Sequence, residues 1–160
     1  MEIVDTPQLS SFLNSNNFVN RVEFFWGNDN CKGQVFRKQM HEYVSGRRIK
    51  CKVYVSARFF RGKWGAKTVH YTKDRRGRWR RSRAEVIYAA YAGNIFNSDC
   101  TLSNAVSGVE EKRNKVKATA VGREPGGLLI PLRVQRESFG SAHSVRHNGK
   151  NYDYFITITW

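Results

Sequence analysis

The sequence has few cysteines and no long hydrophobic run, and these absences exclude several classes of protein. The 160-residue chain contains three cysteines, Cys31, Cys51 and Cys100, an odd number at wide spacing. Such a set does not indicate a disulfide framework and is typical of a reducing compartment. No stretch approaches the roughly 18 apolar residues of a membrane helix, and no secretory signal follows Met1. We therefore expect an intracellular protein, cytoplasmic or nuclear, that is not secreted and has no membrane partner.

Patterns for metal binding and catalysis are also scarce. His143 and His147 have the spacing of the second half of some zinc sites, but no CxxC pair accompanies them. No glycine-rich phosphate loop and no Ser/His/Asp order is present. We therefore predict no metal, no cofactor and no catalytic residue. One alternative remains, because Asp99, Glu110 and Lys112 match the loose spacing of metal-dependent nucleases, in which two carboxylates hold Mg²⁺ and a lysine stabilises developing charge.

Acidic residues are nearly absent from a central stretch that is rich in cations and aromatic rings. Residues 47–81 hold 14 of the 28 Lys and Arg residues and a single acid, Asp74, in a chain of net charge +15. Cations neutralise phosphates and rings stack on bases, so this combination predicts nucleic-acid binding. A solvated basic surface is the alternative, but so large a surplus costs self-repulsion unless a polyanion relieves it.

The residues predicted to bind nucleic acid lie on one strand, two turns and the segment that follows them. Residues 48–60 alternate strictly, which places Ile49, Val53 and Val55 on a core face and the cations on the opposite face. Residues 61–65 and 74–77 contain the glycines of two turns. The predicted binding residues are Lys50, Lys52, Tyr54, Arg58, Phe60, Arg61, Lys63, Trp64, Lys67, Arg75, Arg76, Arg78, Trp79, Arg80, Arg81 and Arg83.

Length and composition predict one globular domain over residues 1–160, of the α+β class. Helical spacing or capping patterns predict helices over residues 7–13, 34–45 and 82–93. Strands are predicted over 18–26, 48–60, 66–73, 115–121, 128–134 and 152–160, with loops over 97–114 and 138–151. The order predicts a mainly antiparallel or mixed sheet, with two or three helices on one face and a split β-α-β-like centre.

The function predicted from this pattern is a small basic protein that binds nucleic acid mainly through phosphates, with RNA favoured over DNA. An accessory or regulatory protein of viral or phage type fits the size, and a homo-oligomer is compatible with it. The alternative is a coat or nucleocapsid protein that packages a genome. Coat proteins commonly carry their charge in a disordered basic arm, whereas residues 1–20 contain no Lys or Arg. The charge distribution therefore favours the accessory protein.

Overall fold

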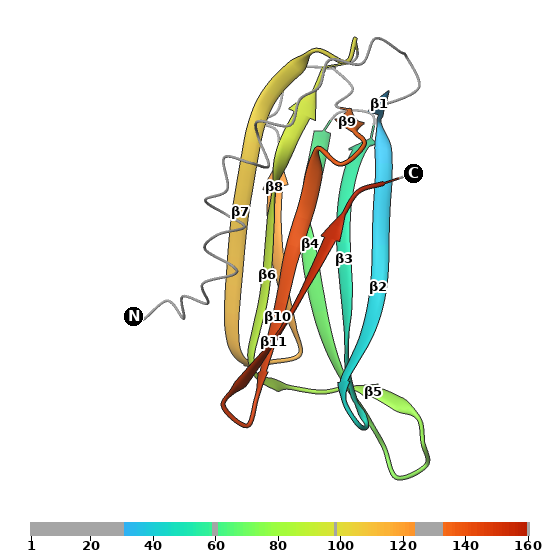
Figure 1. Cartoon of the computed structure of the whole chain (residues 1–160), viewed down its shortest axis with the longest axis vertical. Coiled ribbons are helices and arrows are strands. Elements are labelled where there is room, and N and C mark those ends of the chain that lie inside the picture. The colour runs from blue at the N-terminus through green and yellow to red at the C-terminus, as the bar shows by residue number, and fades with distance from the viewer. Residues whose placement is uncertain (1–30, 59–60, 98, 124–132, 160) are drawn as a thin grey trace.

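The fold is a sandwich of antiparallel β-sheets. The computed structural model describes residues 31–58, 61–97, 99–123 and 133–159, and within these ranges every regular element is a strand (Figure 1). The strands run mainly along the longest axis of the molecule, and two sheets face each other across the core (Figure 1).

One sheet is five-stranded and consists largely of a meander. Its order is β2 (Gln34–Val44), β3 (Arg47–Arg58), β4 (Arg61–Lys73) and β5 (Trp79–Arg81), and β8 (Lys117–Arg123) also pairs with β4. β5 and β8 pair with different parts of β4 along the edge opposite β3, so β4 pairs with three strands. The hairpin between β4 and β5 extends beyond the sandwich at one end (Figure 1).

The other sheet is four-stranded, and two very short strands lie near one end of the sandwich. The order of the four strands is β11 (Lys150–Thr157), β10 (Phe139–His147), β6 (Ala84–Phe96) and β7 (Leu102–Lys115). Figure 1 draws β10 and β11 in front of β3 and β4. The remaining strands, β1 (Cys31–Lys32) and β9 (Val134–Gln135), pair with each other.

The core forms where the inner faces of the two sheets meet. Ile49, Val53 and Val55 of β3 are fully or almost fully buried, and they belong to the same cluster as Ile87 of β6 and Ile156 of β11. Burial of this apolar surface is the main force that holds the sheets together. On the five-stranded sheet, the side chains that alternate with the core residues point to the outer face.

The α+β class and its split β-α-β-like centre were wrong, because no helix occurs among the described residues. The predicted helix over 34–45 is β2: Phe36 and Met40 are spaced as i and i+4, a separation that also places them on one face of a strand. The predicted helix over 82–93 is β6, whose apolar residues are buried on both faces and so show no alternation. The second sheet takes the place expected for helices.

Several loop and turn predictions also need correction. The stretch 97–114 is largely β7, and 138–151 contains β10 and the hairpin into β11. The predicted hairpin tip over 61–65 lies within β4, because Arg61 already pairs with Arg58. Edge strand β7 is mostly exposed, which explains its polar sequence. The predicted helix over 7–13, the strand over 18–26 and most of the strand over 128–134 lie outside the described residues.

Four of the predicted strands are confirmed, with shifted ends. They are β3, β4, β8 and β11, and the alternation predicted for β3 is confirmed, with Ile49, Val53 and Val55 buried. The turn over 74–77 is confirmed as well: the Gly77 amide donates to the Asp74 carbonyl over 2.9 Å, and the Asp74 amide donates to the Arg78 carbonyl over 2.8 Å.

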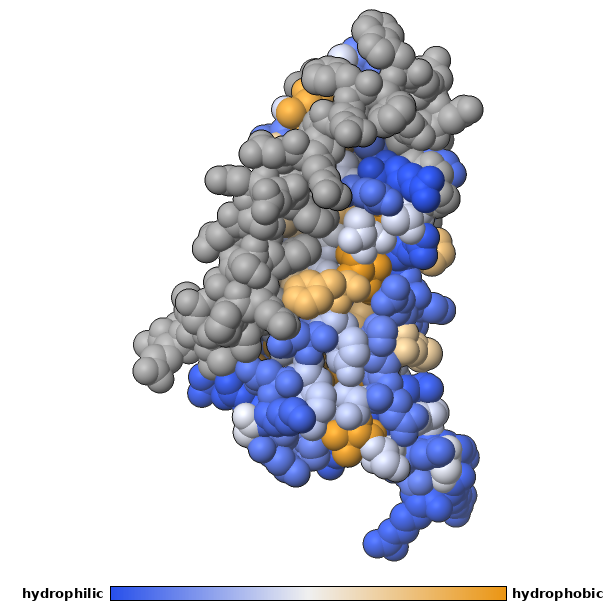
Figure 2. Space-filling model, viewed as in Figure 1, coloured by the Kyte–Doolittle hydropathy of each residue, from blue (hydrophilic) through white to orange (hydrophobic). Residues whose placement is uncertain are grey.

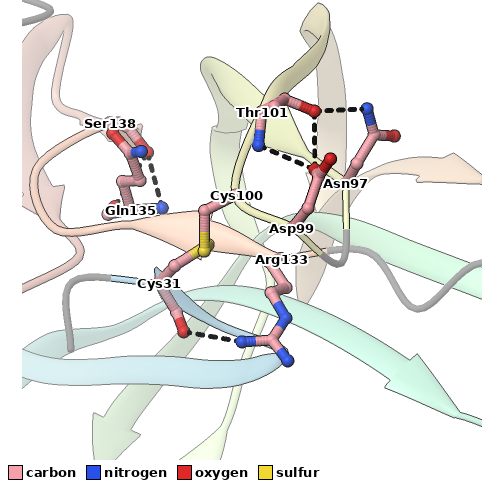
Figure 3. Close-up of a disulfide and its surroundings, with 8 residues drawn as sticks. All are labelled: Cys31, Asn97, Asp99, Cys100, Thr101, Arg133, Gln135 and Ser138. Carbon is pink, nitrogen blue, oxygen red and sulfur yellow. Dashed lines mark hydrogen bonds between the residues drawn. A yellow bond between two sulfur atoms is a disulfide. The ribbon is translucent and has the colours of Figure 1, made fainter. Parts of the chain in front are cut away.

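A disulfide joins Cys31 of β1 to Cys100, in the turn after β6 (Figure 3). The two residues are 69 positions apart in sequence, but their Cα atoms are 6.1 Å apart. The wide spacing of the cysteines did not indicate this bond, because separation in the sequence does not report distance in the fold. Cys51 is free and buried. The cysteine count therefore gives no argument about the cellular compartment.

Among the described ranges there is no helix that is long and apolar enough to cross a membrane.

Candidate nucleic-acid interface

The outer face of the five-stranded sheet, called here the basic face, collects cations from all five strands. The pairing registers place Lys38, Lys52 and Lys67 side by side on β2, β3 and β4. The row on one side contains Lys50 of β3 and Lys117 of β8, which both pair with Val69 of β4. The row on the other side contains Lys63 of β4, which pairs with Arg123 of β8. The cations of the basic face are Lys38, Arg48, Lys50, Lys52, Lys63, Lys67, Lys73, Arg81, Lys117 and Arg123. Among the described residues, Glu42 is the one acid on this face.

A row of rings and apolar side chains crosses the basic face between rows of cations. Phe36 of β2 pairs with Tyr54 of β3, Tyr54 pairs with Gly65 of β4, and Gly65 pairs with Val121 of β8. The ring of Phe36 is exposed, and Tyr54 is half-buried. The ammonium of Lys52 lies 5.1 Å from the Phe36 ring centre and 5.4 Å from that of Tyr54. Cations are thus held close to the rings by cation–π attraction.

Glycine at position 65 allows Tyr54 to lie close to the neighbouring strand. A Cβ atom there would come 3.1 Å from the Tyr54 hydroxyl oxygen and 2.3 Å from the Ala120 carbonyl oxygen. Any other residue would therefore have to displace the Tyr54 ring or separate β4 from β8. Burial raises the pKa of the Tyr54 hydroxyl, and the charge of Arg123 acts in the opposite direction. Tyr54 is consequently a neutral phenol at physiological pH.

Lys67 lies at the centre of the positive charge. Burial lowers the pKa of its ammonium, and the surrounding cations, led by Lys117 and followed by Arg81, Lys52 and Lys50, lower it further. Like charges are therefore close enough to disfavour the charged form of Lys67. A bound polyanion would relieve this repulsion, which makes the row through Lys67 a natural place for phosphates.

One end of the basic face carries an arginine that is held by aromatic rings. The guanidinium carbon of Arg48 lies 4.1 Å from the Trp79 ring centre and 5.6 Å from that of Tyr71. The Lys73 ammonium lies 5.6 Å from the same Trp79 ring. Stacking fixes the planar fork of Arg48, and a fixed fork is suited to phosphate oxygens. Trp79, predicted to stack on bases, therefore supports cations in this structure.

The hairpin between β4 and β5 carries further arginines beside this end of the face. It is called here the arginine hairpin and comprises residues 74–81. The Asp74 carboxylate shapes it, since Oδ1 accepts from the amides of Arg76 and Arg78 over 2.9 and 2.8 Å. These bonds, led by that from Arg78, lower the pKa of Asp74. The side chains of Arg75, Arg76, Arg78, Arg80 and Arg81 are exposed.

The structure divides the sequence-predicted residues into three groups. On the basic face or the arginine hairpin lie Lys50, Lys52, Tyr54, Lys63, Lys67, Arg75, Arg76, Arg78, Trp79, Arg80 and Arg81, and exposed Arg83 follows β5. Trp64 is an exception: its side chain points into the core and is 8% exposed, so its ring offers no stacking surface. Phe60 and the side chains of Arg58 and Arg61 lie outside the part of the chain that the structure describes.

Sequence reasoning missed the contributions of two strands to the basic face. Phe36, Lys38 and Met40 were assigned to a helix, and Lys117 and Arg123 lay in or beside a strand with no visible role. Phe36, Lys38 and Met40 occupy every second position, and this spacing could have indicated that β2 is a strand. Nothing in the sequence signalled the pairing of β8 with β4, because their paired residues are 48 to 60 positions apart.

The opposite outer face, on the four-stranded sheet, has a different character. There Glu111 on β7 lies 3.8 Å from the Arg113 side chain, and Asp153 on β11 adds a second acid. In the view of Figure 2, hydrophobic and weakly polar side chains form a band along the middle, with hydrophilic side chains on either side. Cations also occur on the four-stranded sheet, at Arg113 and Arg146, but acids accompany them there, whereas the basic face combines its ten cations with Glu42 alone among the described residues.

The structure does not assemble the nuclease-like acids into a site. Asp99 accepts hydrogen bonds from the amide and hydroxyl of Thr101 in the turn before β7 (Figure 3). Glu110 lies eight residues into β7, roughly 25 Å along the strand, where it accepts from the Thr119 amide and contacts Lys112 at 3.0 Å. No group of three potential metal ligands occurs among the described residues.

The fold and its charged surface define an antiparallel β-sandwich with one cationic, ring-bearing outer face. No protein-family model, curated protein or solved structure matches the chain.

Proposed function

We propose that the protein binds nucleic acid through the basic face and the adjoining arginine hairpin, with RNA favoured over DNA. The observation that supports this most strongly is the cross-strand alignment of cations, in which Lys38, Lys52 and Lys67 form one row over three strands. Regularly spaced cations on a rigid sheet are suited to a polyanion with regularly spaced phosphates. RNA is favoured because its unpaired bases are common targets of exposed aromatic rings.

The role that fits best is that of an accessory or regulatory binder, not a coat subunit. The cations of the basic face belong to paired strands, so binding charge is displayed by the folded domain. Sizing of the purified protein with and without RNA separates the two roles. A small particle supports the accessory binder, whereas a large shell would favour the coat protein.

The test of binding is a salt titration with two variants of equal charge. In the first, Lys52, Lys67 and Lys117 are replaced by Gln. In the control, three cations outside the five-stranded sheet, Arg113, Arg136 and Lys150, are replaced by Gln. Each phosphate contact contributes roughly 0.7 to the slope of log affinity against log salt for a single strand. For the first variant, the slope should therefore become shallower by about 2. For the control variant, the slope should equal that of the wild-type protein. Equal slopes for both variants would locate binding elsewhere.

A further inference from the structure

We propose that the basic face takes single-stranded nucleic acid and that Phe36 is its base-stacking platform. This proposal rests on the proposed function and specifies the ligand and the residue that selects it. Phe36, the third residue of edge strand β2, pairs with Tyr54 of β3, and its side chain is 63% exposed. The exposed ring offers apolar area on which an unpaired base can stack, and the cations around it can hold the phosphates of the same strand.

The surroundings of Phe36 match the two parts of a nucleotide. Tyr54, directly opposite on β3, extends the ring surface by one strand, a separation of about 5 Å. Two residues along β2, or about 7 Å, the row of Lys38, Lys52 and Lys67 supplies charge on one side. On the other side of the ring row lies the pair of Lys63 and Arg123. Rings flanked by cations can stack bases while the phosphates reach the lysines.

Duplexes do not fit this arrangement. Bases inside a duplex stack on one another and present only their edges in the grooves, so an exposed ring on a flat sheet cannot reach their faces. A duplex would contact the cations of the basic face through its phosphates and leave Phe36 unused. Unpaired bases, in contrast, can lie on Phe36 and gain both interactions.

Phe36 is a better platform than the other rings of the predicted site. Trp64 belongs to the core, and Trp79 carries Arg48 at 4.1 Å. Tyr54 is half-buried, with Lys52 and Lys63 at 5.4 and 6.0 Å from its ring centre. Phe36 has Lys52 near its ring and most of its remaining surface in solvent.

The experiment compares three probes across a salt series: a 20-nucleotide single-stranded RNA, an abasic strand with the same phosphates, and an RNA duplex. Wild-type protein should bind the base-containing strand about tenfold more tightly than the abasic strand. Phe36→Leu, which keeps an apolar side chain and removes the ring, should abolish this difference, and Phe36→Trp should retain it. The matched control is Met40→Ala, on the same strand and face and 47% exposed, which should leave the preference unchanged.

The outcomes separate this proposal from the proposed function. Salt-dependent binding with equal affinity for the base-containing and abasic strands overturns the stacking platform and leaves phosphate binding intact. Preference for the duplex, or a preference for bases that survives Phe36→Leu, also overturns it. Absence of salt-dependent binding to all three probes overturns the proposed function itself.

Discussion

The hydroxyl of Thr68 and the imidazole of His143 meet between the two sheets, with Oγ1 2.7 Å from Nδ1, and both side chains are fully buried. Thr68 donates its own hydrogen to the Tyr88 carbonyl over 2.6 Å, so its oxygen accepts from the protonated Nδ1. The other ring nitrogen, Nε2, then accepts from the Ser141 hydroxyl at 2.8 Å. These bonds assign a neutral imidazole to His143 and connect β4 to β6 and β10 inside the core.

Stability should therefore fall with pH below neutrality. Burial lowers the pKa of His143 from the ordinary 6.5 to about 3, with a further contribution from His41. Between these values the unfolded chain binds a proton that the folded protein does not, so the stabilisation is complete above pH 6.5 and is lost toward pH 3. Burial of His70 acts in the same direction. Denaturant unfolding should show a decrease of about 1.4 kcal/mol per pH unit from His143 alone.

The control for this prediction is His143→Gln, which lacks a titrating group. It should be less stable at neutral pH, with a shallower decrease between pH 6.5 and 5. Stability that is constant over that interval in the wild-type protein would contradict a buried neutral His143.

Val53 and Tyr54 are consecutive on β3, but alanine substitution should lower stability at Val53 and RNA affinity at Tyr54. Val53 is fully buried, so Val53→Ala should lower the free energy of unfolding by roughly 2 kcal/mol and leave RNA affinity unchanged. Tyr54 belongs to the basic face, so Tyr54→Ala should weaken binding by roughly 1–3 kcal/mol. Thermal unfolding and a binding titration of both variants provide the check. If Tyr54→Ala unfolds the protein and the remaining folded fraction binds RNA normally, the assignment of the core face and the outer face of β3 is wrong.

The arginine hairpin should contribute affinity without base selectivity. Replacing Arg75, Arg76, Arg80 and Arg81 together by Gln removes charge from exposed side chains and leaves the amide bonds to Asp74 available. Affinity for mixed-sequence RNA should fall for every sequence, and the salt dependence should become shallower. Unchanged circular dichroism confirms an intact fold. Normal binding by the folded variant would assign the hairpin to solubility or to nuclear targeting instead.

Reduction of the Cys31–Cys100 disulfide should destabilise the protein. The bond closes a long loop, because the two cysteines are 69 positions apart, and the chain-entropy relation assigns about 4 kcal/mol to a loop of this length. Unfolding should be measured with and without a thiol reductant. The double variant Cys31→Ser, Cys100→Ser should resemble the reduced protein and be insensitive to the reductant. Equal stability of the oxidised and reduced wild-type protein would exclude this contribution.

Local patterns in the sequence were sufficient for the strand that carries the predicted binding residues. The alternation of Ile49, Lys50 and their neighbours fixed both faces of β3, because a strand with one buried face must place every second residue in the core. The same reasoning identified β4, β8 and β11. Asp74 and Gly77 likewise determined a turn, since their backbone requirements are local.

Helix and strand could not be separated locally for β2 and β6. Phe36 and Met40 satisfy both the helical i, i+4 spacing and the even spacing of a strand face, and only pairing with β3 decides between them. In β6, Ile87 and Ala90 lie on opposite faces and are both fully buried, so the strand shows no alternation. Burial by a second layer of structure is a property of the whole fold, not of the segment.

By itself, the sequence determined that the protein is strongly basic, that its cations and rings are concentrated in residues 47–81, and which face of β3 they occupy. Tertiary structure decided which rings are accessible: it buried Trp64, placed Arg48 on Trp79 and left Phe36 in solvent. It also brought β8 beside β4, which added Lys117 and Arg123 to the basic face. The physical reason is that accessibility and cross-strand neighbours arise from long-range pairing and packing, and these depend on residues far away in the chain.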